Sequence, residues 1–385
     1  MFWFWQPCYL WYINSGFFAR PGPKILSKHS GNRRMNSLIS IQLLRAVAAW
    51  MVVYHHYMQF FHGFNHSSTL GQFFSDWGDF GVDIFFVISG FIMFHSLASR
   101  EYGAKEFFVK RLLRIVPAYW FYTLLMVLLS WGYIKEFSYT GWNLNTLVSS
   151  LFFIPTINPS GKIGYYPLLT VGWTLNIEMF FYAWLSFCIF IFGRFRFLVC
   201  AITLIAFPLI WDEHWIYAPV LSNKLLYEFV FGLALGYGYQ GLKNVKPYIS
   251  YVIGAPLLLF MALWFQMNFK GVPGWMFSQN RSFLACLLVL SALCFEPKLS
   301  TVKIKAFQAM TYLGDISYST YLLHSLVIVV FTHYFRNLGS ASGEGLLLFT
   351  VSLTILVLSH ISYQFIETGT VSAMLKKKAN FKQLL

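Results

Sequence analysis

The stretch that decides the fold is residues 40–62, SIQLLRAVAAWMVVYHHYMQFFH. It is apolar and long enough to cross a bilayer, yet it carries Arg45 near its start and His55 and His56 further along. Charged and titratable groups are costly inside hydrocarbon, so they usually face a polar interior and usually have a function. We therefore interpret this stretch as a membrane helix that carries part of a site.

The spacing of Arg45 and His56 predicts that both side chains lie on one face of this helix. Eleven residues at about 100° per residue make roughly three full turns, which is about 16 Å along the axis. His55 should point about 80–100° away from that face. One face thus presents a cation near the first membrane surface and an imidazole well inside.

The composition is that of a polytopic membrane protein. Of the 385 residues, 57% are hydrophobic and only 11% are charged, whereas soluble domains carry about 25% charged residues. An additional apolar run, at 146–156, is predicted to be re-entrant or interfacial. Ten other apolar segments are predicted to span the membrane: 38–62, 80–98, 113–132, 171–192, 196–211, 224–240, 249–267, 282–296, 315–335 and 344–366.

The distribution of lysine and arginine predicts the orientation. With ten spans and the N-terminus inside, the inner segments hold 21 of these residues and the outer loops hold 6. This asymmetry follows the positive-inside rule, and an eleventh span would reverse it. The net charge of +14 therefore indicates topology rather than a nucleic-acid partner. We expect an all-α bundle of about ten transmembrane helices with both termini cytoplasmic.

Three parts of the chain are expected. Residues 1–36 form a poorly ordered leader, 37–367 the membrane domain, and 368–385 a basic cytoplasmic tail. Met35 directly precedes the first span, so translation starting there is an alternative. The five cysteines lie singly, which indicates neither a disulfide framework nor a metal site. A Walker loop and an HExxH motif are both absent from the sequence.

Three further charged residues are candidates for a site. Arg111 and Arg114 are three apart, hence on one helix face, at the cytoplasmic start of the third span. They either anchor the topology or bind the phosphates of a cytosolic cofactor. Pro117 should fall within the first turns of that helix. Glu178 lies inside an otherwise apolar helix and needs a cationic or hydrogen-bonding partner.

The remaining deep polar groups have structural interpretations. Asp83 fits a helix cap as well as it fits a catalytic group, and Glu228 lies within the sixth span. His324 fits a helix–helix hydrogen bond better than catalysis. On these features alone, a secondary transporter or a flippase of lipid-linked sugars is a second class of function. The lack of an inverted repeat in the sequence weighs against that class.

Five segments together resemble the membrane-bound acyltransferase-3 family. SIQLLRA (40–46) and GWTLNIEMFFY (172–182) look closest to its exopolysaccharide O-acetyltransferase branch. The resemblance covers about residues 37–367. The segments are LLRAVAAWMVVYHH (43–56), FGVDIFFVISGFIM (80–93), FFVKRLLRIVPAYW (107–120), GWTLNIEMFFY (172–182) and ISYSTYLLH (316–324).

The resemblance implies ten spans and transfer of an acyl group from cytosolic acyl-CoA to a sugar hydroxyl. The family's basic-x10-His pattern falls on Arg45 and His56, and its RxxR pattern on Arg111 and Arg114. The commoner form of the Glu178 element has a following acidic position, which is Met179 here. The implied partners are acyl-CoA, with acetyl-CoA as the default donor, a glycan or lipid-linked sugar, and the lipid bilayer of a bacterial inner membrane. No metal is implied.

The predicted mechanism assigns a role to each candidate. Arg111 and Arg114, with Arg45 deeper in the membrane, hold the donor, and His56 removes the proton from the sugar hydroxyl as a general base. Acylation of His56 itself and relay to the sugar is the rival route. Glu178 either orients His56 or neutralises an arginine. The catalytic candidates are therefore His56, Glu178 and Arg45.

Overall fold

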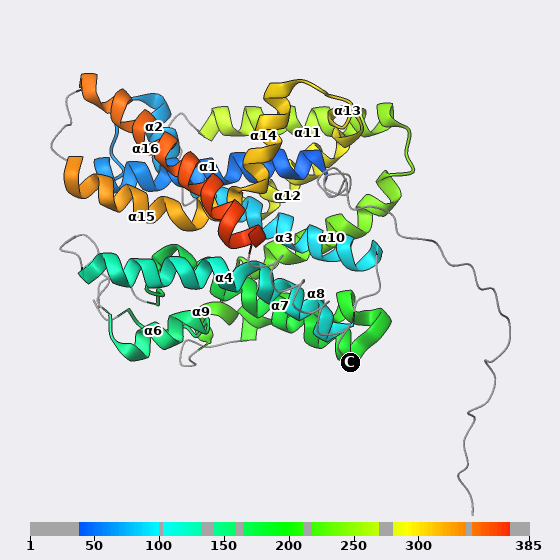
Figure 1. Ribbon diagram of the computed structural model, residues 1–385. Coiled ribbons are helices and arrows are strands. Elements are labelled where there is room, and N and C mark those ends of the chain that lie inside the picture. Colours follow the sequence, from blue (N-terminus) through cyan, green and yellow to red (C-terminus); the bar gives the residue numbers. More distant parts are fainter. Residues whose placement is uncertain are drawn as a thin grey trace, which may run out of the picture. The chain divides into compact units, whose positions relative to one another are not determined.

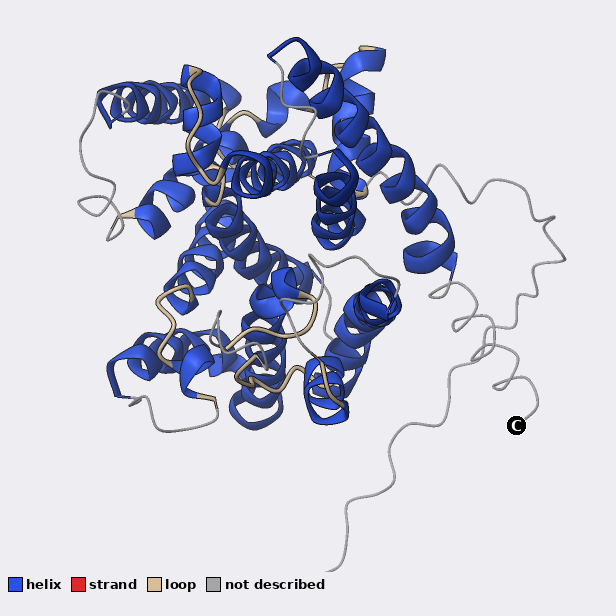
Figure 2. Ribbon diagram, turned by 90° about the vertical axis from the view of Figure 1, so that its left-hand side faces the viewer, coloured by secondary structure: helices blue, strands red, loops and turns tan. Residues whose placement is uncertain are grey.

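The structure is a computed structural model that describes most of the chain. The regular structure of the described residues is entirely helical (Figure 2), as predicted. The predicted leader lies outside the described residues, and so does the predicted tail after residue 369. The described ranges are 38–99, 103–131, 142–158, 165–210, 217–268, 280–335 and 341–369.

Each of the ten apolar segments contains a helix. These helices are α1 (Ile39–His62), α3 (Phe80–Ser99), α4 (Ala104–Trp131), α7 (Trp173–Phe192), α8 (Arg196–Ile210), α10 (Leu226–Leu242), α11 (Pro247–Asn268), α12 (Arg281–Cys294), α15 (Ser317–Phe335) and α16 (Ala341–Ser362). Shorter elements connect them: α2 (Thr69–Trp77), α6 (Leu144–Leu151), η2 (Thr170–Gly172), η3 (Gly193–Phe195), α9 (Ala218–Leu221), α13 (Glu296–Leu299), α14 (Lys305–Asp315) and the π-helical turn η6 (Tyr363–Thr368).

Four helical stretches of the described residues are long and apolar enough to cross a membrane: Phe80–Ala98, Ala104–Ser130, Thr170–Ile210 and Gly343–Thr368. A fifth results if α14 and α15, which are bent by 70°, form one span. α1 is not among them, because its arginine, glutamines and histidines lower its mean hydropathy. The chain thus has the helices of a membrane protein, while the count of ten spans and the orientation of the termini stay predictions.

Two helices, α4 and α6, can be compared with the predicted segments in detail. α4 begins nine residues earlier than predicted, where the i,i+4 ion pair Lys110–Glu106 (2.7 Å) favours helix. Pro117 therefore lies in the interior of α4 and not within its first turns, which corrects the prediction. α6 has 8 residues, about 12 Å of helix. It is too short to span, in agreement with the prediction for 146–156.

The apolar stretch from η2 to α8 is a hairpin of two helices. Gly193 has φ 48° and ψ −110°, a conformation that a residue with a side chain rarely adopts. The Trp184 indole donates a hydrogen bond to Thr203 Oγ1 at 2.7 Å, which joins α7 to α8. Two helices thus occupy the two predicted segments, while the crossing of the membrane by each of them stays a prediction.

α1 packs against α3, α12, α14 and α15, as the blue helix in Figure 1 shows. Its N-terminus is capped from a distant part of the chain. The amides of Ile39 and Ser40 donate to the Glu296 carboxylate of α13 at 2.9 and 2.7 Å. This carboxylate satisfies two of the orphan donors of the first turn and complements the helix dipole. α1 is thus held at its start as well as along its length.

α3 and α10 approach closely at a pair of glycines. A Cβ on Gly90 would lie 2.3 Å from Phe229 O, and one on Gly232 would lie 2.2 Å from Val87 O. Backbones can come this near only where neither residue has a side chain. Gly90 and Gly232 therefore allow the close approach of α3 and α10.

An ionic network joins the start of α3 to α12. Arg281 donates to Asp83 at 2.7 Å and to Asp79 at 2.9 Å. The fully buried Glu228 of α10 accepts a hydrogen bond from Ser282 at 3.0 Å. These contacts tie three helices together, and they favour the structural interpretation of Asp83 and Glu228 over the catalytic one.

Candidate active site

The two adjacent histidines of α1 face different neighbours, as predicted. His56 Nδ1 lies 3.2 Å from His324 Nε2 of α15, and the two ring centroids are 5.0 Å apart. His55 Nδ1 lies 3.1 Å from the carbonyl oxygen of Phe74 in α2. The helical spacing therefore directs His56 to α15 and His55 away from it.

The hydrogen bonds of the imidazole pair define which nitrogens carry protons. A carbonyl oxygen only accepts, and His324 Nδ1 lies 3.2 Å from Thr320 O, so this nitrogen donates. His56 Nδ1 lies 3.0 Å from Val52 O and donates in the same way. His324 Nε2 is then an acceptor for the His56 Nδ1 proton. His56 Nε2 keeps its lone pair, which is the condition for a general base or a nucleophile.

The two imidazoles differ in accessibility. His324 is fully buried, whereas His56 is partly exposed. One turn before His324, the Tyr321 ring lies 5.8 Å from the His324 ring. The Tyr321 hydroxyl donates to Val171 O at 3.0 Å, at the entrance to α7. The predicted helix–helix hydrogen bond of His324 is confirmed, and its partner is the site histidine itself.

Arg45 lies buried at the other end of the same helix. Its guanidinium donates to Gln42 Oε1 at 3.2 Å, and only 8% of the residue is exposed. α14 reaches this position through Gly314, where a Cβ would lie 2.0 Å from Gln42 O. The charges within electrostatic range of Arg45 are Arg114, Glu367, Asp315 and Glu178.

The two arginines of α4 lie at different depths. Arg114 is exposed, and its charge acts on both Arg45 and Glu367. Arg111 is partly buried, with its guanidinium 5.8 Å from the centre of the Tyr182 ring. Arg45 and Arg114, which the sequence analysis assigned to one donor-binding set, lie within electrostatic range of each other. Glu367 is a carboxylate on which both of these guanidiniums act.

Glu178 is held by hydroxyl groups. It accepts hydrogen bonds from Ser89 of α3 and from Tyr182, one turn further along α7. Its charge also reaches Arg45. Two roles were predicted for Glu178: orienting His56 or neutralising an arginine. Its interaction with the charge of Arg45 favours the second role.

Sequence reasoning missed the role of Glu367. This carboxylate accepts a hydrogen bond from Ser319 and acts on Arg114 and Arg45, although it lies far along the chain in η6. Its signal in the sequence is a single acidic residue near the end of the last apolar segment. Only packing of η6 against α4 brings it to the site.

Guanidiniums lie at one end of α1, and an imidazole with a free lone pair lies further along this helix. This arrangement is suited to group transfer from an anionic donor inside a membrane protein. The chain belongs to the acyltransferase-3 family, because the family's acyltransferase domain matches residues 38–361. The family resemblance predicted from the sequence is confirmed. The matched range contains His56, His324 and all three arginines of the site.

The chain is also similar to individual proteins. It is 33% identical over 303 residues to the exopolysaccharide production protein ExoZ of Rhizobium meliloti (strain 1021), which covers 75% of this chain and 88% of that protein. It is 24% identical over 372 residues to a Staphylococcus aureus (strain COL) protein provisionally named an O-acetyltransferase. That match covers 87% of this chain but 58% of the other protein. Solved structures give no significant match.

Proposed function

We propose that this protein is a membrane O-acyltransferase of the bacterial inner membrane. It moves an acetyl or other short acyl group from cytosolic acyl-CoA to a hydroxyl of a surface or exported glycan. Family membership supports acyl transfer, and the relative concerned with exopolysaccharide production supports a glycan acceptor. The observation that carries the proposal is the hydrogen bonding of His56, which leaves Nε2 as a base on the helix that also carries Arg45.

The arginines are the proposed binding site for the donor. Acyl-CoA carries several phosphate groups, and guanidiniums bind phosphate through paired, charge-assisted hydrogen bonds. Arg114 is exposed, Arg111 partly buried and Arg45 buried. This gradient is suited to phosphates held at Arg111 and Arg114, with the pantetheine arm passing Arg45 on the way to His56.

The chemical step uses His56 as a base. Its Nε2 takes the proton of the acceptor hydroxyl while the oxygen attacks the thioester carbonyl, and the carbon–sulfur bond then breaks. The imidazolium returns the proton to the departing thiolate, so the products are the sugar ester and CoA. His324 accepts a hydrogen bond from His56 Nδ1 throughout and holds the ring. Glu178 is a positioning residue near the arginines.

The same lone pair also fits the relay route, in which Nε2 attacks the thioester and an acyl-imidazole passes the group to the sugar. The two routes differ in whether the protein itself carries label. Rapid acid quenching after mixing with radiolabelled acetyl-CoA, without acceptor, detects an acylated chain only in the relay.

The test of the proposed function compares two neighbouring histidines. Membranes with wild-type protein, His56→Ala or His55→Ala receive labelled acetyl-CoA, and label on glycan is measured per amount of protein. Loss of a general base lowers the rate by about 10²–10⁴-fold, so His56→Ala should be nearly inactive. His55→Ala is the matched control, because His55 faces α2. Equal labelling by wild type and His56→Ala removes His56 from the mechanism.

A second measurement identifies the acceptor. NMR of the extracted glycan from cells with and without the gene should show an ester that depends on this protein. If the glycan is unchanged but a lipid or a small molecule carries the label, the proposed glycan acceptor is wrong. The proposed acyltransferase activity would still stand.

A further inference from the structure

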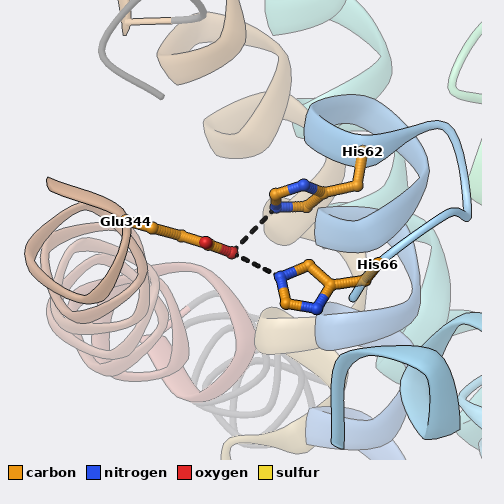
Figure 3. A group of neighbouring side chains, drawn as sticks. All are labelled: His62, His66 and Glu344. Carbon is orange, nitrogen blue, oxygen red and sulfur yellow. Dashed lines mark hydrogen bonds and ion pairs between the residues drawn. The ribbon is translucent and has the colours of Figure 1, made fainter. Parts of the chain in front are cut away.

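Three side chains outside the proposed active site converge at the far end of α1. His62 is the last residue of α1, His66 follows in the loop before α2, and Glu344 lies in the first turn of α16. Their potential ligand atoms all lie within 4.8 Å of one another. Figure 3 shows both imidazoles directed at the same carboxylate. The proposed acyl transfer uses none of the three.

The carboxylate satisfies one imidazole but not the other. His66 Nε2 hydrogen-bonds to Glu344 Oε1 at 2.8 Å. His62 Nε2 lies 3.0 Å from the same oxygen but off the direction that a hydrogen bond requires. This buried nitrogen makes no hydrogen bond to any described residue. A cation placed between the three atoms would give all of them a partner.

We propose that His62, His66 and Glu344 form a binding site for a divalent transition metal, with Zn²⁺ as the best-suited ion. Two imidazoles and a carboxylate are a ligand set that zinc uses, with water in the fourth position. His62 and His66 have the H-x3-H spacing found among zinc ligands. The residues are 23%, 13% and 32% exposed, so an ion can reach them without unfolding.

The geometry fits such an ion after a small adjustment. Two ligand atoms about 2.1 Å from a tetrahedral zinc lie about 3.4 Å apart. The distances of 2.8 and 3.0 Å from Glu344 Oε1 to the two imidazole nitrogens are a few tenths of an ångström shorter. Rotation of the partly exposed Glu344 side chain would lengthen both distances. The two imidazole nitrogens, which lie within 4.8 Å of each other, would also have to approach the same ion.

The surroundings of His66 also fit. Its Nδ1 lies 2.8 Å from Ser68 Oγ, so with metal on Nε2 the Nδ1 proton has an acceptor. The Ser68 amide now donates a hydrogen bond to Nδ1 at 3.0 Å. With metal bound, this amide would donate to water instead, because it lies at the surface. Gly71 leaves room for the ring, since a Cβ there would lie 2.3 Å from His66 Nδ1.

A metal bound here would join the end of α1 to the start of α16. α1 is also the helix that carries His56. His62 follows His56 by six residues, about 9 Å of helix. The site would therefore fix the end of α1 nearest the proposed base. Because the metal does not contact the reacting atoms, its role is positional.

The test uses the full chain in detergent, purified with an affinity tag that lacks histidine. After chelation and dialysis, the protein is titrated with Zn²⁺ and, separately, with Co²⁺, whose visible absorption reports tetrahedral nitrogen and oxygen ligation. We expect one equivalent per wild-type chain. His66→Gln and Glu344→Gln should each weaken binding by about 100-fold or more, since even changes outside the ligand set cost 10–100-fold.

Two further variants keep the proposal falsifiable if ligand variants fold poorly. Gly71→Ala removes no ligand but displaces the His66 ring, so it should also lose the metal. His95→Gln is the matched control, because His95 stacks on Phe91 of α3, away from the cluster. Wild-type protein that binds no ion, or equal binding by wild type, Glu344→Gln and Gly71→Ala, overturns the proposal. Loss in His95→Gln as well would reject this assignment.

Discussion

The contact between His324 and His56 predicts a graded loss of activity in His324 variants. His56 Nδ1 has two acceptors, Val52 O at 3.0 Å and His324 Nε2 at 3.2 Å. His324→Leu removes one acceptor and leaves the other, so the tautomer survives but the ring is held less firmly. A net hydrogen bond contributes about 0.5–1.5 kcal/mol, and about 1.4 kcal/mol is tenfold in rate. We expect kcat to fall about tenfold.

The assay is initial-rate transfer of labelled acetyl from acetyl-CoA to glycan, normalised to the amount of folded protein. The KM for acetyl-CoA should not change, because His324 is fully buried and the charged groups that act on it are His56 and His55. His324→Gln places an amide near the position of Nε2 and should retain most of the activity. The loss in His324→Leu should also be much smaller than that in His56→Ala.

Two results would refute this reasoning. Wild-type kcat in His324→Leu would show that the imidazole pair does not position the base. Complete inactivity of both His324→Leu and His324→Gln in folded protein would show that His324 itself takes part in the chemistry. Thermal unfolding of each variant in detergent separates these outcomes from loss of the fold.

Further predictions concern the donor site and the helix contacts. Arg111→Ala should raise the KM for acetyl-CoA about 10-fold or more, because a hydrogen bond to a charged group contributes about 1.5–3 kcal/mol. Arg281→Met should destabilise the protein by about 3–5 kcal/mol, since it leaves the buried Asp83 carboxylate without its cation. Gly232→Leu should abolish folded protein, because even a Cβ there would lie 2.2 Å from Val87 O; size-exclusion chromatography in detergent measures this.

Matched variants separate these effects from general damage. Arg194→Ala removes a cation from the turn between α7 and α8, where it lies over Phe195, and should leave the KM unchanged. Lys110→Ala breaks an exposed ion pair and should cost less than about 1 kcal/mol. An unchanged KM in Arg111→Ala would count against phosphate binding there. Equal melting temperatures for Arg281→Met and wild type would show that the network contributes no stability.

Much of the fold followed from the sequence. Hydropathy located the helices, because each apolar segment must satisfy its backbone groups internally once it leaves water. Helix ends were less certain: α4 starts earlier than its apolar segment, since amphipathic residues such as Glu106 and Lys110 continue a helix into the polar region. The 70° bend between α14 and α15 was also not foreseen. Near this bend Gly314 packs against α1, where a Cβ would lie 2.0 Å from Gln42 O.

The candidate site was predictable only along single helices. The period of the helix placed Arg45 and His56 on one side of α1 and turned His55 elsewhere. It did not predict that His324 would be the hydrogen-bond partner of His56, or that Glu367 would share its charge with Arg45 and Arg114. These contacts join residues from distant parts of the chain, and nothing in local sequence encodes which helices become neighbours.

The sequence by itself determined the membrane character, the helices, the family and the residues able to react. Local chemistry suffices for these, because apolar length, helical period and side-chain type act within one segment. The tertiary structure decided which nitrogen of His56 is free, which carboxylates face the arginines, and that His62 and His66 meet Glu344. Such outcomes depend on packing between helices, where contacts of a few ångströms select one arrangement among many that the same pattern allows.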